Sequence, residues 1–515
     1  MARLKEYNGH YCESEYEYAF IGFLEAEGWK YSSGNNIRRI TKRDVLIADD
    51  FKKFIADTNP DLTEDEVTQI YDNVRLVGAE SDFATLHKVY GWMVNGVQFT
   101  TQDGLPRMIP LIDFDNWDKN IFRVVNQFTV EYTNNGQKEN RRPDVLLFVN
   151  GMPLCVVELK NPVDANATIY DAWEQINIRY WRDIPHLLHY CPLACISDGV
   201  KTRLGTVRTP YEHFYAWRRV NEGDVVSTLP FAETETMIKG VYTPERFVEI
   251  FRDYIYFQDS IYDSDEVEIV CRYPQFFAAK LLKQSIVNSV VTRSGKGGTY
   301  FGATGCGKTY TMAFLARQLA LRCTDIPEIG SPTIILIVDR DELQKQGSKL
   351  FTKSKEFLNL GEVSVVKNRT QLRQELGARQ SGGFYICTIQ KFCDREDDKI
   401  GLINDRQNII CFSDEAHRTQ LEHSKKIQFS KDADENMKAM VSKPYAKVLK
   451  EAFPHATFVG FTGTPIAETY QTFGDEIDRY TMDQAVADGL TVSIKYHPRI
   501  AKVLLCLLYT SDAAD

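Results

Sequence analysis

Residues 302–309, with the sequence GATGCGKT, have the residue types and the spacing of a nucleotide-binding loop. They match the pattern G-x-x-x-x-G-K-[ST] at every fixed position, between a short apolar run and an apolar helical pattern. Glycines allow backbone N–H groups to surround a phosphate, and the dipole of the following helix favours the same anion. Lys308 would reach the β- and γ-phosphates, and the Thr309 hydroxyl would hold Mg²⁺. The residues expected to bind ATP here are Gly302, Thr304, Gly305, Gly307, Lys308 and Thr309.

A second part of this ATP site is predicted at Asp414-Glu415-Ala416-His417, directly after the apolar run 408–413. Asp414 would hold Mg²⁺ through water, and Glu415 would polarise the attacking water. His417 would sense the nucleotide or contact the next motif. A D-E-A-H string alone is weak evidence, but it is strong when it follows a complete phosphate loop and an apolar strand.

Polar residues also end other apolar runs in this half of the chain. The runs are residues 333–338, 384–391 and 457–461, and the last is followed by T-G-T-P, with Thr462 and Thr464. Continuous apolar runs are typical of parallel strands covered on both faces. In such sheets the site forms at the carboxyl ends of the strands, so the sequence predicts an α/β fold with a parallel sheet.

Gln275 stands at the start of a helical pattern before the phosphate loop. In many DNA motors a glutamine at this place reads the adenine edge, so Gln275 is a candidate for base selection. One amide is not a motif, and a surface glutamine is an equally good interpretation.

Two acids and a lysine near residue 150 indicate a different chemistry. Pro143-Asp144 opens one predicted strand, Asn150-Gly151 predicts a hairpin turn, and Glu158-Leu159-Lys160 ends the next strand. Glu158 and Lys160 would point to one face. Asp144 and Glu158 could hold Mg²⁺ while Lys160 orients a water for attack on a phosphodiester. The alternative is an ordinary strand with a solvated face, but the apolar run 154–157 predicts a buried strand, where Glu158 needs a partner or a metal.

The elements that must position these residues follow from periodicity and turn signals. Helical patterns cover residues 14–29, 61–94 and 168–181, whereas strands are expected at 120–132, 143–148 and 154–160. The aromatic and basic residues 214–219 form either core with a solvated rim or, less favoured, a stacking platform for bases.

Composition fits a protein of two to four domains without a membrane segment. The 515 residues are 43 % hydrophobic and 26 % charged, and no apolar run reaches the length of a bilayer span. Eleven cysteines without paired spacing indicate a reducing, cytoplasmic location. The net charge of −10 excludes a protein that coats nucleic acid with its whole surface but allows a local basic groove.

The order of these motifs resembles the restriction (motor, HsdR-type) subunit of type I restriction–modification enzymes. Supporting strings are residues 197–206, 272–280 and 473–480. The resemblance implies a restriction-endonuclease-like PD-(D/E)xK domain, then a superfamily-two helicase domain that moves double-stranded DNA with ATP. It also implies cleavage of unmethylated foreign DNA, with methyltransferase (modification) and specificity subunits as partners. Glu17 resembles the acid on the first nuclease helix, and Gln175 and Tyr180 resemble a Gln…Tyr pair whose usual spacing is four rather than five.

The expected domains are a nuclease at 1–225, a helical connector at 226–268, a first RecA-like domain at 269–505 and a non-native tail at 506–515. Neither the second RecA-like domain nor the helical docking region of the family follows, so a C-terminal truncation is expected. Two other functions remain open at this stage. One is a repair or recombination helicase–nuclease without a methyltransferase partner, and the other is a nucleotide-gated DNA-binding protein with a degenerate nuclease.

Overall fold

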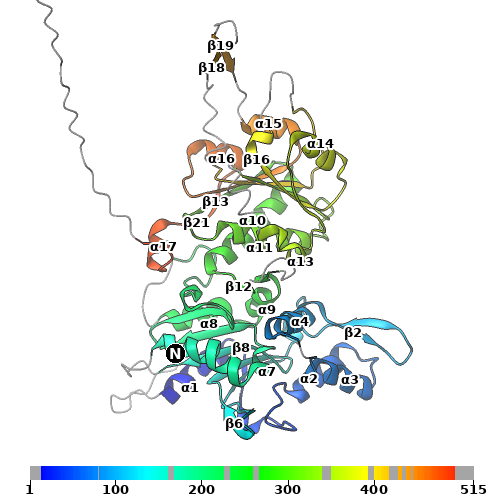
Figure 1. Cartoon of the computed structure of the whole chain (residues 1–515), viewed down its shortest axis with the longest axis vertical. Coiled ribbons are helices and arrows are strands. Elements are labelled where there is room, and N and C mark those ends of the chain that lie inside the picture. Colours follow the sequence, from blue (N-terminus) through cyan, green and yellow to red (C-terminus); the bar gives the residue numbers. More distant parts are fainter. Residues whose placement is uncertain are drawn as a thin grey trace, which may run out of the picture.

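The computed structural model describes residues 13–492 except 79, 161–167, 226–231, 259–265, 339–349, 393–399, 417–426, 432–436 and 442–444. The expected tail at 506–515 therefore lies outside the described residues. Two lobes, each built around one sheet, are stacked along the long axis of the molecule (Figure 1).

The N-terminal lobe is built on a mixed six-stranded sheet of order β1-β4-β7-β8-β9-β10. Its strands are β1 (Lys30–Ser33), β4 (Phe122–Asn126), β7 (Val145–Val149), β8 (Met152–Leu159), β9 (Leu193–Ser197) and β10 (Thr202–Thr206). Every residue of β7 and β8 is buried, and they form the predicted hairpin around Asn150 and Gly151, whose φ angles are 50° and 77°. Helix α1 (Glu13–Ala26) contacts β1, β4 and β8, as expected from the helical pattern at 14–29.

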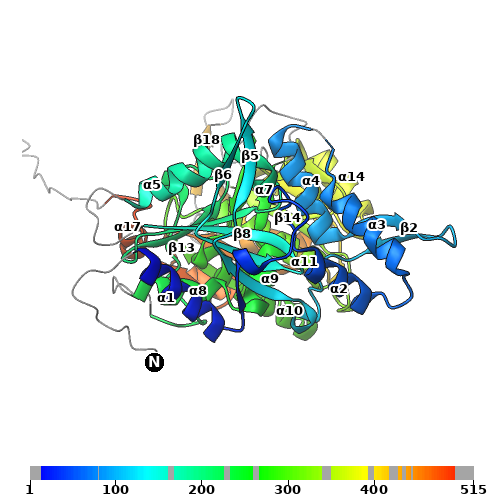
Figure 2. The same cartoon turned by 90° about the horizontal axis from the view of Figure 1, so that it is seen from below.

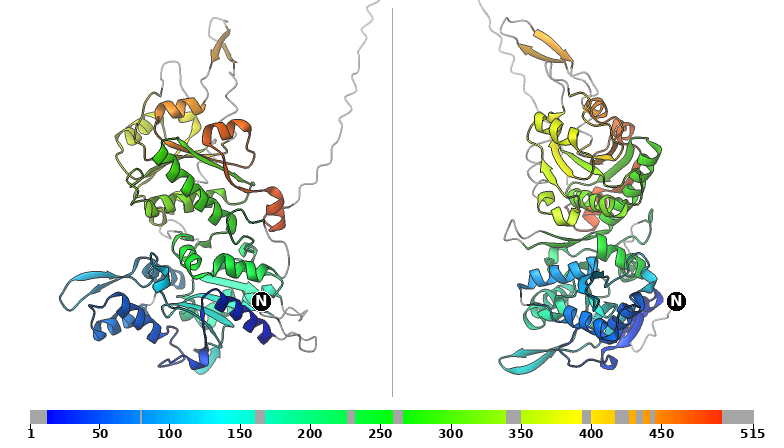
Figure 3. Two further views of the ribbon diagram at one scale, coloured as in Figure 1. Left: turned by 180° about the vertical axis from the view of Figure 1, so that it is seen from behind. Right: turned by 90° about the vertical axis from the view of Figure 1, so that its right-hand side faces the viewer.

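The strand expected from 120 to 132 is wrong as one element, because the chain turns at Gln127, where φ is 56°. Strand β5 (Val130–Asn134) leaves the main sheet and pairs only with β6 (Gln137–Arg141). This hairpin projects from the lower lobe in the right-hand view of Figure 3.

A small helical unit is inserted between β1 and β4. It comprises α2 (Ala48–Thr58), α3 (Glu64–Arg75) and α4 (Asp82–Asn95), followed by the hairpin of β2 (Val97–Thr100) and β3 (Pro106–Ile109). The helical pattern at 61–94 is thus two helices. Thr63 forms a capping box with Glu66, and Ser81 caps α4, so each helix has its own start signal.

The predicted helix at 168–181 is continuous but changes its winding. It runs through α5 (Ile169–Glu174), the π-helical turn η3 (Gln175–Tyr180) and α6 (Trp181–Asp183). A π turn carries one residue more than an α turn and is frequent at functional sites. The short helix α7 (Pro185–Leu188) follows.

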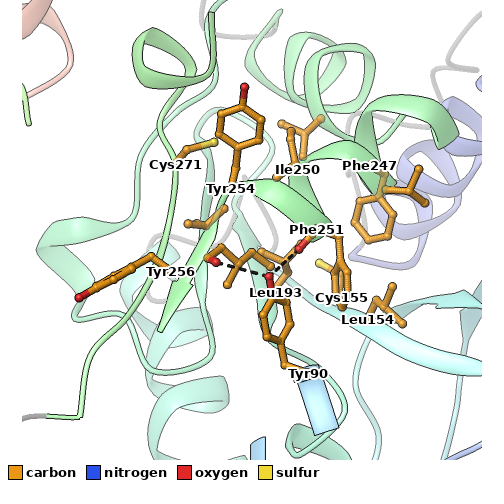
Figure 4. Packing of buried hydrophobic residues seen from close by; sticks show 14 of the residues in the cluster. Tyr90, Leu154, Cys155, Leu193, Phe247, Ile250, Phe251, Tyr254, Tyr256 and Cys271 are labelled. Atoms are coloured by element: carbon orange, nitrogen blue, oxygen red, sulfur yellow. Dashed lines mark hydrogen bonds between the residues drawn. The ribbon is translucent and has the colours of Figure 1, made fainter. Parts of the chain in front are cut away.

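The connector is helical only in its first part. Helices α8 (Ala232–Val241) and α9 (Pro244–Asp253) are followed by β11 (Ile255–Phe257) and β12 (Glu268–Val270), which pair antiparallel. The apolar and aromatic residues of these two strands favour a sheet over a helix. Figure 4 shows the resulting packing, in which the Tyr90 hydroxyl donates a hydrogen bond to the Phe251 carbonyl at 2.9 Å. The connector therefore shares a core with the N-terminal sheet.

The C-terminal lobe contains a seven-stranded parallel sheet of order β15-β16-β14-β17-β20-β13-β21, as the apolar runs predict. Its strands are β13 (Lys296–Gly302), β14 (Thr333–Val338), β15 (Val363–Val365), β16 (Phe384–Thr388), β17 (Ile409–Asp414), β20 (Thr457–Thr462) and β21 (Glu476–Tyr480). The edge strand β21 was not predicted, because its sequence EIDRY is mostly polar and only partly buried.

Helices surround this sheet (Figures 1 and 3). They are α10 (Tyr273–Thr292), α11 (Lys308–Arg322), α13 (Lys355–Leu358), α14 (Arg369–Ala378), α15 (Tyr445–Ala452), α16 (Ala467–Phe473) and α17 (Met482–Ala487). A separate hairpin consists of β18 (Ile427–Lys431) and β19 (Met437–Val441). Among the described helices, none pairs the length of a bilayer span with a sufficiently apolar sequence.

The residues at 214–219 are core and interdomain contact, not a stacking platform. Trp217 is buried at 2 % exposure. Arg218 Nε lies 2.5 Å from Asp488 Oδ1, and Arg219 Nη1 lies 2.9 Å from Asp478 Oδ1. Both arginines are therefore used to join the lobes.

Candidate nuclease and ATPase sites

Strand register brings Asp144 and Glu158 together. Val145 pairs with Val157 in the antiparallel β7–β8 ladder. The next two positions along this ladder, Asp144 and Glu158, therefore lie opposite each other. Asp144 Oδ2 accepts a hydrogen bond from the Leu159 N–H at 2.8 Å. Two carboxylates far apart in the sequence are thereby fixed at one edge of the sheet.

Glu158 is the most deeply buried acid of this site, with no exposed surface. Burial raises its pKa well above the usual range, and the neighbouring Asp144 charge raises it further, whereas Lys160 opposes the rise. One oxygen, Oε2, is buried and has no hydrogen-bond partner within the described part of the chain. A buried carboxylate oxygen beside a second acid is a site that a cation would stabilise.

A hydrogen-bonded chain links Glu158 to the π turn. Tyr180 donates its hydroxyl proton to Glu158 Oε1 at 2.5 Å, Gln175 Nε2 donates to the Tyr180 hydroxyl at 2.9 Å, and Lys160 Nζ donates to Gln175 Oε1 at 2.9 Å. Lys160 Nζ also lies 3.8 Å from Glu158 Oε2. In an α-helix, residues five apart do not face each other, but the π turn places Gln175 and Tyr180 on one side. The unusual spacing is therefore compensated by the winding of the helix.

Glu17 stands beside these acids, in agreement with its expected place on the first helix. Its side chain is 6 % exposed, and its Oε1 accepts a hydrogen bond from Asn126 Nδ2 at 2.6 Å. Burial raises the pKa of Glu17, Asp144 adds to that rise, and the Arg142 cation opposes it. Sequence reasoning missed Asn126, although a polar residue ending the apolar strand β4 was a usable signal.

The donor set suits one hard cation held partly by water. Asp144 and Glu158 supply carboxylate oxygens, which Mg²⁺ prefers, and Mg²⁺ usually keeps several waters when bound by one or two carboxylates. Within the described ranges, no three or more His, Cys, Asp and Glu side chains are grouped to hold a metal ion. The orphaned Oε2 of Glu158 is the observation that fits a metal here.

The phosphate loop connects β13 to α11 as the motif requires. Gly305 and Gly307 have φ angles of 81° and 85°, which favour glycine, and Gly307 precedes the first residue of α11. No side chain caps α11, so its first N–H groups remain available to an anion. A Cβ on Gly302 would come within 2.6 Å of Tyr300 Cε1, so only glycine fits there.

The charged residues of the ATP site meet at this loop. Lys308 Nζ donates to the Gly302 carbonyl at 3.2 Å and lies 3.9 Å from Glu415 Oε1. Burial and the Glu415 charge raise the pKa of Asp414 to about 6, although Lys308 opposes the rise. Glu415 has a φ of 49°, an unusual backbone angle for a residue with a side chain and one that is often found at functional sites. His417 lies outside the described residues.

The T-G-T-P segment lies against the phosphate loop. A Cβ on Gly463 would be 3.3 Å from the Gly302 carbonyl and 3.4 Å from Thr304 Oγ1. Thr462 is fully buried, and its Oγ1 accepts a hydrogen bond from the Thr464 N–H at 3.1 Å. The sheet order β17-β20-β13 explains this proximity, because the three motifs follow neighbouring parallel strands.

Gln275 is not a surface residue, since only 3 % of it is exposed. Its Oε1 accepts a hydrogen bond from the Arg272 N–H at 2.9 Å, and its Nε2 donates to the Gly307 carbonyl at 3.3 Å. The side chain thus joins the start of α10 to the phosphate loop, and its role in base selection stays a prediction.

Comparisons with known proteins match each half of the chain. The family described as type I restriction enzyme R protein N terminus matches residues 11–213, and the SWI2/SNF2 ATPase family matches residues 274–506. The HindI type I restriction enzyme endonuclease subunit of Haemophilus influenzae is 31 % identical over 94 % of this chain and 46 % of its own length. The protein named putative type I restriction enzyme MjaIXP endonuclease subunit, from Methanocaldococcus jannaschii, is 29 % identical over 95 % and 46 %.

The chain spans about half the length of the curated relatives it matches. Among solved structures, the ATP-dependent Type ISP restriction-modification enzyme LlaBIII bound to DNA is 16 % identical, with a TM-score of 0.30, over 45 % of this chain and 17 % of that one.

Proposed function

The chain belongs to the endonuclease (HsdR-type) subunits of type I restriction enzymes, and we propose that it combines a Mg²⁺-dependent DNA nuclease with part of an ATP-driven DNA translocase. The observation that carries the nuclease half is the buried Glu158 Oε2, which has no hydrogen-bond partner among the described residues and lies next to Asp144 and Lys160. The specific activity is that of a type I site-specific deoxyribonuclease, which cleaves unmethylated foreign DNA.

In the nuclease site each residue has a separate task. Asp144 and Glu158 would hold Mg²⁺, which when bound supplies charge stabilisation to the phosphate and lowers the pKa of a bound water. Lys160 orients the attacking water and stabilises negative charge on the phosphate, at a position 3.8 Å from Glu158. Tyr180 and Gln175 position Glu158 and Lys160 through their hydrogen bonds.

In the ATP site the phosphates would lie on the N–H groups of the loop and the start of α11. Lys308 exchanges its contact with the Gly302 carbonyl for the β- and γ-phosphates. Thr309 and Asp414 would hold Mg²⁺, and Glu415 polarises the attacking water. Gln275 is proposed to select the base.

Double-stranded DNA and the methyltransferase and specificity subunits are the proposed partners. Sequence recognition would then lie in the specificity subunit, and this chain would contact phosphates and groove shape. The names of the curated relatives support restriction over a repair helicase–nuclease, and the close grouping of Asp144, Glu158 and Lys160 supports an intact rather than a degenerate nuclease. A cytoplasmic location is proposed, since the eight cysteines in the described part of the chain are free and buried.

The experiment compares Asp144→Asn with the control Asp118→Asn in the assembled complex, with cleavage and ATP hydrolysis measured separately. Asp118 lies in the short helical turn Trp117–Lys119 of the same lobe, away from the β7–β8 edge. Asp144→Asn should abolish cleavage and leave ATP hydrolysis unchanged, whereas Asp118→Asn should change neither. Persistent cleavage by folded Asp144→Asn would refute the metal site, and loss of both activities would refute the division between the lobes.

A further inference from the structure

A short basic loop, residues 38–43 with the sequence RRITKR, stands out on the nuclease lobe. Arg38, Lys42 and Arg43 are exposed, and in the described part of the chain none of the three pairs with a carboxylate. Ile40 between them is 85 % exposed. Three unneutralised cations around an exposed aliphatic side chain contrast with a chain whose net charge is −10.

The basic loop is held in place rather than loosely attached. The Arg39 guanidinium stacks 3.9 Å from the centre of the buried Phe128 ring and donates to the Thr129 carbonyl at 2.9 Å. Asp44 Oδ2 accepts hydrogen bonds from the N–H and the hydroxyl of Thr41, at 2.8 and 3.1 Å. Arg39 and Asp44 thus fix the base of the loop, so that Ile40 is presented to solvent without a partner.

The loop leaves the sheet at the edge that carries the nuclease acids. Strand β1 ends at Ser33, which pairs with Asn126, and Asn126 pairs with Val145, the neighbour of Asp144. The chain then passes tightly over β4, since a Cβ on Gly34 would be 2.6 Å from Phe128 Cα.

The loop also lies beside the projecting hairpin of β5 and β6. The Lys42 carbonyl accepts a hydrogen bond from the Glu131 N–H at 3.0 Å, and Figure 2 shows this part of the chain next to β5. Arg142, which follows the hairpin, is exposed and close enough to lower the pKa of Glu17. The hairpin thus links the basic loop to Arg142, a further exposed cation that lies near the acids.

We propose that the basic loop is the surface with which the nuclease lobe holds duplex DNA, through its phosphates and its minor groove. Arg38, Lys42 and Arg43 contact backbone phosphates, and Ile40 inserts into the minor groove and partly unstacks a base step. This inference rests on the proposed nuclease function, because it assigns the duplex to the edge that holds Asp144 and Glu158.

The first test is the salt dependence of duplex binding by the full chain in EDTA without ATP. Each lost phosphate contact lowers the slope of log K against log salt by about 0.9, so the triple variant Arg38→Ala, Lys42→Ala, Arg43→Ala should lose close to 3. The control removes three exposed lysines elsewhere on the same lobe, Lys53, Lys88 and Lys119, and should keep the wild-type slope. Equal slopes for both triple variants would overturn the proposal.

The second test concerns the aliphatic wedge and uses a duplex labelled with 2-aminopurine, whose fluorescence rises when the base unstacks. The wild-type chain should raise the fluorescence, Ile40→Ala should lose that rise while keeping the salt slope, and the control Leu76→Ala, 66 % exposed in the wild type, should behave as wild type. An unchanged signal in Ile40→Ala overturns the wedge. If the wild-type complex cuts DNA and the basic-loop triple variant binds DNA normally, this inference alone is refuted. If the wild-type complex neither binds nor cuts DNA, the proposed function is refuted.

Discussion

The nuclease edge and the phosphate loop differ in what holds their charged groups. At the nuclease edge, Glu158 has no exposed surface, and Lys160, Gln175 and Tyr180 already bond to it or to one another. At the phosphate loop, α11 has no capping side chain, and a Cβ on Gly305 would meet nothing within 4 Å. One site is a closed network of side chains, and the other is an open arrangement of backbone.

This difference predicts how each site should respond to substitutions. A metal site needs fixed acidic oxygens, so the strand register must bring the two acids together, and the residues of the π turn help to orient them. A phosphate site needs backbone N–H groups and one cation, which a local glycine-rich loop supplies. Substitutions should therefore affect DNA cleavage and ATP hydrolysis separately. The size of each effect should depend on whether the substitution removes a side-chain hydrogen bond or a contact of the phosphate loop.

The largest effect is expected for Lys308→Ala, because Lys308 is the side-chain cation of the loop and is proposed to contact the phosphates. ATP hydrolysis should fall by at least about 10²-fold and translocation should stop, while DNA binding persists. ATPase and binding assays on the assembled complex measure this, with Lys296→Ala as the control, because Lys296 is an exposed lysine on β13, the strand that precedes the loop. Normal ATP hydrolysis in Lys308→Ala would show that the loop does not bind the nucleotide.

Tyr180→Phe should have a smaller effect and act on the nuclease alone. Removing the hydroxyl leaves Glu158 Oε1 without its donor and Gln175 Nε2 without its acceptor. Cleavage at limiting Mg²⁺ should fall about 10–100-fold and recover in part at high Mg²⁺, since such partners orient metal ligands. Tyr190→Phe, which removes another buried hydroxyl of this lobe, is the control. A loss that Mg²⁺ does not influence would contradict the positioning role.

A buried acid outside both proposed sites should make the stability of the protein depend on pH but not on Mg²⁺. Burial holds the pKa of Glu268, on β12, well above its usual 4.5, and neither of its carboxylate oxygens has a hydrogen-bond partner among the residues that the structure describes. Above pH 4.5 the folded protein keeps a proton that the unfolded chain has lost, so stability falls as the pH rises toward the raised pKa.

As the pH rises above 4.5, Glu268→Gln should therefore become more thermally stable than wild type. The expected difference is about 2–4 °C in Tm for each kcal/mol of unfolding free energy. Scanning calorimetry across pH, with and without Mg²⁺, measures the difference. A Tm difference that is constant with pH would show that Glu268 does not titrate in this range.

The smallest effect is expected from deleting Ile178, an exposed residue of the π turn. The deletion converts the π turn to an α turn and brings Gln175 and Tyr180 to a spacing of four, which also places them on one face. Cleavage should fall by less than about 10-fold, the lower end for losing a positioning partner. Inserting an alanine at the same place should lower cleavage more than the deletion does. An equal loss of cleavage from both changes would show that the spacing between Gln175 and Tyr180 does not matter.

Local sequence was sufficient for much of the fold. The apolar runs predicted the parallel strands of the C-terminal lobe, and Asn150-Gly151 predicted the β7–β8 hairpin. Strand β21 was missed because its sequence is mostly polar. The connector strands β11 and β12 were missed because each has only three residues, too few to show an alternating pattern. The turn at Gln127 was missed since nothing in its neighbours marks a left-handed residue.

Local sequence was enough to find the phosphate loop and to predict that Asp144, Glu158 and Lys160 meet, because contiguous motifs and a hairpin depend on local spacing. The tertiary structure decided that Glu17 and Asn126 lie beside Asp144 and that Gln275 is buried against Gly307. The physical reason is that these proximities depend on sheet order and helix winding, which arise from burying the whole core rather than from any local pattern.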